Sequence, residues 1–113
     1  MYQTMVDQDA SFYLMVVVAM SDHEIHEKEA TAIKEIADNF KIEFDPYLAA
    51  QEISEKFGNY FNRACDYYIS IIQNTEVQKN TLEFIKKITY ADLKIHDKEI
   101  EIIEKCRKKW EIK

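Results

Sequence analysis

Glycine and proline are almost absent from this chain, with one residue of each among 113. Folds built from short strands need these residues at many of their turns, so a turn-rich all-β fold is excluded. The shortage of glycine also excludes the glycine-rich loops that hold nucleotide phosphates. Apolar residues make up 47% of the sequence, which is enough to form a core. We therefore expect one all-α domain that spans residues 1–113.

Cysteine and histidine are also scarce. Cys65 and Cys106 are the two cysteines, they form no C-x-x-C pair, and they are too few for a disulfide-framed secreted domain. A signal peptide would require a base before its apolar run, but the first base of the chain is Lys28. No apolar run approaches the roughly 20 residues that span a bilayer. These absences predict a cytoplasmic protein with buried thiols.

Positive charge is rare in the first half of the chain. Residues 1–57 carry twelve acids and four bases, whereas residues 58–113 carry nine acids and eleven bases, for a net charge of −6. An acidic chain lacks the basic footprint of a nucleic-acid-binding protein. One basic cluster stands out, and it either complements the dipole of a helix C-terminus or forms a binding patch. Its members are Lys105, Arg107, Lys108, Lys109 and Lys113.

The periodicity of apolar residues predicts six helices. The first is apolar on nearly all sides and is expected to be enclosed by the others. Asp9 and Asp45 are predicted N-caps, Gly58 a left-handed C-cap, and Thr75 with Gln78 a capping box. The expected helices cover about residues 10–21, 27–39, 46–57, 60–72, 76–90 and 97–110.

A stretch of this chain occurs twice, seventy positions apart. Residues 21–42 and 91–112 align without a gap at seven identities in 22, where chance gives roughly one or two. Each copy joins two expected helices through an acidic elbow (residues 22–29 and 92–99). We therefore predict two helix–elbow–helix repeats, over about 9–42 and 75–112. The identical pairs are Asp22/Asp92, Ile25/Ile95, His26/His96, Lys28/Lys98, Glu29/Glu99, Ile33/Ile103 and Ile42/Ile112.

The carboxylates of the elbows have two kinds of explanation. Glu29 and Glu99 fall at the third position of a helix, where a carboxylate accepts from backbone N–H groups. Asp22 and Asp92 lie at the end of the preceding helix, where the dipole disfavours an acid. Either each aspartate forms an Asx-turn, or the elbows bind a hard cation, Ca²⁺, Mg²⁺ or Mn²⁺ rather than Zn²⁺. Both interpretations stay open.

The elbows resemble the tellurite-resistance TerB-like family. That family has an acid that closes one helix, then Gly-x-Ile/Val, then three residues and a Glu in the next helix. His23 and Leu93 replace the usual glycine here. The residues that carry the resemblance are Asp22, Ile25 and Glu29 in one copy and Asp92, Ile95 and Glu99 in the other.

The resemblance implies an all-helical domain with two pseudo-twofold-related repeats around central helices. It also implies a non-enzymatic, cytoplasmic bacterial protein of the tellurite and chemical stress response. Its divalent metal would be held by Asp22, Glu29, Asp92 and Glu99. We expect the ion to join the two hairpins. Protein partners, including membrane-associated ones, are expected.

Two other functions remain as alternatives. One is a metal-free interaction or scaffold module, in which the acids only cap helices and face solvent. The other is a metal-assisted hydrolase, which needs an open pocket and a catalytic base. No nucleophile paired with a base emerges from the sequence, so no catalytic residue is assigned.

Overall fold

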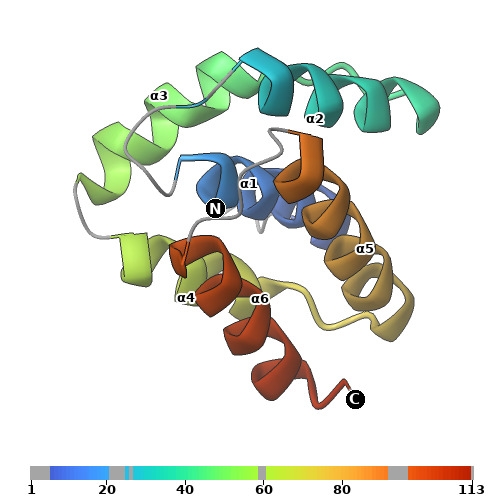
Figure 1. Cartoon of the computed structure of the whole chain (residues 1–113), viewed down its shortest axis with the longest axis vertical. Coiled ribbons are helices and arrows are strands. Elements are labelled where there is room, and N and C mark those ends of the chain that lie inside the picture. Colours follow the sequence, from blue (N-terminus) through green and yellow to red (C-terminus); the bar gives the residue numbers. More distant parts are fainter. Residues whose placement is uncertain (1–5, 21–24, 26, 59–60, 92–96, 113) are drawn as a thin grey trace, which may run out of the picture.

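The computed structural model describes residues 6–20, 25, 27–58, 61–91 and 97–112, and its secondary structure there is entirely helical (Figure 1). The all-α prediction is confirmed. The radius of gyration, 12.8 Å, is close to the value for one compact domain of about 100 residues. No helix in these ranges is both long and apolar enough to cross a bilayer. The helices are α1 (Asp7–Ala19), α2 (Glu27–Asn39), α3 (Pro46–Phe57), α4 (Phe61–Ile71), α5 (Thr75–Ala91) and α6 (Asp97–Trp110).

Helix α1 lies at the centre of the domain, as its apolar sequence predicts. It contacts each of the other five helices, which enclose it in Figure 1. From Ala10 to Ala19 every side chain is buried except Tyr13, which is half-buried. Phe12 and Leu14 are fully buried. A helix without a polar face is stable only when its neighbours cover all its sides.

The start of α1 differs from the prediction. The helix begins at Asp7, and Val6 precedes it without a side-chain cap, so Asp9 is a first-turn residue and the N-cap assignment was wrong. The Asp7 Oδ2 atom accepts the backbone N–H groups of Gln73 (3.0 Å) and Asn74 (2.8 Å). This acid therefore fixes the connection between α4 and α5 to the start of α1.

The capping box predicted at Thr75 is also wrong. Asn74 caps α5 instead, because its Oδ1 atom accepts the N–H of Val77 at 3.2 Å. Thr75 is then the first residue of the helix. The side-chain amide of Gln78 donates to the carbonyl of Ile72 at 2.9 Å, rather than to the backbone of the cap.

Helix α3 begins as the sequence predicts and ends slightly differently. Asp45 Oδ1 accepts the N–H groups of Tyr47 (2.9 Å) and Leu48 (3.3 Å), and Pro46 is the first helical residue. Gly58 ends the helix with φ 61° and ψ −127°. The positive φ is confirmed, but the backbone lies in the mirror-β region that glycine alone enters easily, outside the left-handed helical basin.

Helices α1 and α5 meet through two side chains that are seventy positions apart. The hydroxyls of Ser11 and Thr81 lie 2.6 Å from one another and are buried. Thr81 donates its single proton to the carbonyl of Val77 at 2.6 Å. Because that proton is used, the hydroxyl of Ser11 is the donor between the two helices.

Helices α2 and α6 end in the same backbone motif, again seventy positions apart. Lys41 and Glu111 have φ values of 57° and 53°. The next N–H reaches back to a carbonyl five residues earlier in both cases, from Ile42 to Ala37 (2.9 Å) and from Ile112 to Arg107 (3.0 Å). This is the Schellman motif, in which an apolar residue follows the left-handed one. The motif explains why an isoleucine stands at both position 42 and position 112, which the sequence alone did not reveal.

These two ends lead to a stability prediction. A side chain in the left-handed conformation is strained, and glycine relieves that strain. We expect Lys41→Gly and Glu111→Gly each to raise the free energy of unfolding by about 0.5 kcal/mol, since relief of strain exceeds the entropy cost of glycine. Urea denaturation followed by circular dichroism measures this. Lys34→Gly, at an exposed position in the middle of α2, should instead lower the free energy of unfolding by about 1 kcal/mol.

Candidate metal site

The two glutamates assigned from the sequence occupy equivalent places in the fold. Helix α2 begins at Glu27 and α6 begins at Asp97, so Glu29 and Glu99 are the third residues of their helices. This position was predicted for both. Their side chains start close to the positive end of a helix dipole, which favours a carboxylate there.

Both glutamates are buried, which sequence reasoning missed. Glu29 is 1% exposed and Glu99 is 2% exposed. Helical spacing could have revealed this, since Glu29 shares the inner face of α2 with the buried Ile33, and Glu99 shares that of α6 with the buried Cys106. A buried carboxylate costs several kcal/mol unless hydrogen bonds or a cation compensate it. Two buried carboxylates thus occupy matched positions of α2 and α6.

The other two assigned ligands lie outside the described residues. Asp22 and Asp92 fall there, and so do the matched histidines of the elbows, His26 and His96. Within the first elbow, Ile25 is half-buried and packs against the core. The described part of each elbow therefore contributes one buried carboxylate.

The two glutamates stand on separate helices, on different sides of α1. Helices α2 and α6 each contact α1 but make no contact with one another within the described residues. Figure 1 shows α1 between them, with α2 above and α6 below. No group of three or more His, Cys, Asp or Glu side chains comes together in ranges 6–20, 25, 27–58, 61–91 and 97–112. A complete site built on Glu29 or Glu99 would therefore draw its other ligands from the adjoining elbow.

The two thiols offer no competing chemistry. Burial raises the pKa of Cys65 to about 12 and that of Cys106 to about 12, although the nearby Lys105 opposes the shift. Both thiols are consequently protonated at neutral pH. A protonated, buried thiol is neither a nucleophile nor a metal ligand.

Comparison with known families settles the relationship that the elbows suggested. The family model described as tellurite resistance protein TerB matches residues 8–113. The chain belongs to the TerB family. The match includes all six helices almost completely, and both elbows, despite His23 and Leu93 in place of glycine. No curated protein and no solved structure matches the chain. The all-helical architecture agrees with that expected of a TerB domain.

Proposed function

We propose that this TerB domain binds divalent metal at its elbows, through Asp22 with Glu29 and through Asp92 with Glu99. The observation that supports this is the burial of Glu29 and Glu99 at the same position of two separate helices. A cation next to each carboxylate offsets the cost of burying its charge. Because α2 and α6 do not meet in the described residues, we propose one ion at each elbow in place of a shared ion.

The end of α1 also favours a cation. The helix ends at Ala19, three residues before Asp22, so its last carbonyls and the negative end of its dipole lie next to the first elbow in the chain. Carboxylate oxygens, carbonyl oxygens and water are the ligands of Ca²⁺, Mg²⁺ and Mn²⁺. Helix α5 ends at Ala91, directly before Asp92, so the negative end of its dipole likewise lies next to the second elbow in the chain.

We also propose that the two sites descend from one duplicated hairpin, repeated over about 9–42 and 75–112. Three matched features support this proposal. Ser11 contacts Thr81, as equivalent residues do on a twofold axis. The Schellman motifs of α2 and α6 fall at equivalent positions after a shift of seventy. The buried residues Glu29 and Glu99 are also seventy positions apart. A duplicated hairpin carries two equivalent sites.

Isothermal titration with Ca²⁺, Mg²⁺, Mn²⁺ and Zn²⁺ tests the metal sites. We expect two ions per chain, and a stabilisation of about 2.7 kcal/mol per site at one hundred times Kd. Glu29→Gln and Glu99→Gln should each remove one ion, and should leave the metal-free domain folded because they replace a buried charge with a neutral side chain of the same shape. Asp22→Asn and Asp92→Asn should act in the same way.

Glu35→Gln is the matched control, because Glu35 is exposed on α2 and the substitution changes net charge equally. It should leave both the number of ions and their affinities unchanged. A metal-dependent rise in melting temperature that survives in the Glu29→Gln/Glu99→Gln double variant would exclude these residues as ligands.

The wider role that we propose is a non-enzymatic one in the bacterial response to tellurite and chemical stress, within the cytoplasm. The protonated thiols supply no nucleophile, in keeping with a binding function. A metal-free interaction module is the second candidate. The exposed side chains of Tyr47 (53%) and Leu48 (59%), adjacent on the first turn of α3, favour a protein partner at that surface.

A further inference from the structure

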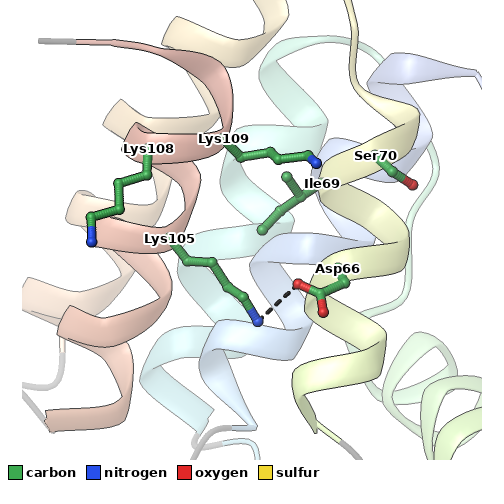
Figure 2. A pocket seen from close by; sticks show the side chains of 6 residues that line it. All are labelled: Asp66, Ile69, Ser70, Lys105, Lys108 and Lys109. Carbon is green, nitrogen blue, oxygen red and sulfur yellow. Dashed lines mark ion pairs between the residues drawn. The ribbon is translucent and has the colours of Figure 1, made fainter.

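A groove runs between α4 and α6, away from the first turn of α6 where Glu99 lies. Its volume is about 650 Å³, within the range of small-molecule sites. Three of its six lining side chains are lysines, and one is an acid. Figure 2 shows the lining residues, which are Asp66, Ile69 and Ser70 of α4 and Lys105, Lys108 and Lys109 of α6.

The lysines of this groove differ in their partners. Lys105 Nζ lies 2.8 Å from Asp66 Oδ1, and both side chains are partly exposed to solvent. Lys109 extends from α6 toward Ile69 and Ser70 in Figure 2. Neither Lys108 nor Lys109 has a carboxylate within ion-pair distance in the described part of the chain. Lys109 therefore brings an ammonium group to the groove that is paired with no carboxylate among the described residues, whereas Lys108, which also lines the groove, extends away from α4 in Figure 2.

The fold does not need these bases to end the helix. Helix α2 ends in the same Schellman motif as α6, yet its last turn contains no base. The positions of α2 that correspond to Lys105, Lys108 and Lys109 after a shift of seventy are an acid, an acid and an amide: Glu35, Asp38 and Asn39. Complementing the helix dipole is therefore not a sufficient reason for the basic cluster.

We propose that the groove between α4 and α6 binds a phosphate-bearing anion through Lys105, Lys108 and Lys109. Lysine ammonium groups bind phosphate as point charges with rotatable donors. The hydroxyl of Ser70 donates to the carbonyl of Tyr67 at 2.6 Å, so the lysines carry the recognition. Asp66 pairs with Lys105, and an incoming phosphate competes with it. The phosphate belongs either to a soluble polyphosphorylated ligand or to a phospholipid headgroup.

The protein contains its own reporter of occupancy. Trp110 is the single tryptophan of the chain, and it follows Lys109 directly. Its indole Nε1–H donates to the carbonyl of Ile69 at 3.2 Å, and Ile69 lines the groove. An anion placed between Lys109 and Ile69 changes the electrostatic field at the indole ring, so tryptophan emission follows binding.

Titration of the whole chain with sodium tripolyphosphate in 20 mM salt, followed by Trp110 emission, tests the proposal. We expect saturable binding that weakens as salt rises toward 200 mM, because screening shortens the range of the attraction. Lys108→Gln and Lys109→Gln should each weaken binding by about 2- to 5-fold. Asp66→Asn should tighten it by about 3-fold, since Lys105 is released and a repelling charge is removed.

Lys34→Gln is the matched control, because Lys34 is exposed on α2 and the loss of charge is the same. It should leave the affinity for tripolyphosphate unchanged. A second arm uses vesicles with and without 30% phosphatidylglycerol. Binding to these vesicles alone, with the same dependence on Lys108 and Lys109, identifies a headgroup as the source of the phosphate.

Two results overturn the proposal. One is the absence of saturable binding to tripolyphosphate and to the anionic vesicles. The other is an equal loss of affinity for tripolyphosphate in Lys34→Gln and in the groove variants. That result would show that binding depends on net charge alone. All the substituted side chains are exposed. Circular dichroism of each variant confirms that the fold is intact.

Discussion

Raising the pH from 9 to 11 should lower the free energy of unfolding by about 4 kcal/mol through Cys65 and Cys106 alone. Burial raises the pKa of each thiol from 9.0 to about 12 in the folded chain. The unfolded chain therefore loses these protons near pH 9, while the folded chain keeps them. A group with a raised pKa in the folded state stabilises the fold fully below its unfolded pKa, and that contribution is lost as pH rises toward the folded value.

Tyr68 adds to this loss in the same direction, because burial raises its pKa to about 12. Burial also raises the pKa of Tyr13, whose hydroxyl donates to Glu52 Oε2 at 2.7 Å. Urea denaturation at intervals of half a pH unit measures the effect. A typical domain has only 5–15 kcal/mol of stability, so the transition at pH 11 should fall to much lower urea.

The double variant Cys65→Ala/Cys106→Ala separates the thiols from the other groups. It should be less stable than the parent at pH 7, but its stability should fall much less steeply between pH 9 and 11. In the parent, both thiols should resist a disulfide reagent at pH 8 until urea unfolds the chain. An unchanged pH slope in the double variant would contradict the assignment of the effect to these thiols.

Trp110→Ala should destabilise the domain by about 3 kcal/mol. Trp110 is 9% exposed, and its indole N–H donates to the carbonyl of Ile69 in the last turn of α4. Carbonyls in the last turn of a helix have no partner within that helix. The substitution therefore removes both packing and a hydrogen bond that joins α4 to α6. Chemical denaturation followed by circular dichroism measures the loss, since the variant lacks tryptophan.

The residue that aligns with Trp110 after a shift of seventy provides a matched control for this prediction. Phe40 stands seventy positions before Trp110, but it is 43% exposed, although its ring contacts Phe12 and Phe84. Phe40→Ala should cost about 1 kcal/mol, in proportion to the smaller area that it buries. Trp110→Phe keeps most of the packing and should also cost about 1 kcal/mol, from the lost hydrogen bond. Equal losses for Trp110→Ala and Phe40→Ala would contradict this account.

Local patterns in the sequence predicted the helices whose ends depend on local chemistry. The boundaries of α2, α3 and α6 follow from apolar spacing and, for α3, from Asp45 and Pro46. The start of α1 could not be predicted in this way. It depends on Asp7, whose carboxylate binds the backbone of Gln73 and Asn74 more than sixty residues later. No local pattern contains that contact.

The candidate site also has some features that the sequence predicted and others that it could not predict. The position of Glu29 and Glu99 at the third residue of each helix was predictable from the doubled motif, and their burial was implicit in helical spacing. The placement of α2 and α6 on either side of α1 was not, because it depends on how these helices pack. The left-handed residues Lys41 and Glu111 were not predictable either, since neither is glycine or asparagine.

The contacts of α1 with all five other helices have a consequence for synthesis of the chain. Its apolar sides emerge from the ribosome before the helices that cover them, and the hydrogen bond from Ser11 to Thr81 forms only after a residue seventy positions later has been made. At about 5–20 residues per second, α1 is made roughly 4–14 s before α5 can cover it. A nascent chain that ends before α5 therefore exposes an apolar helix, and is expected to depend on chaperones until α5 emerges.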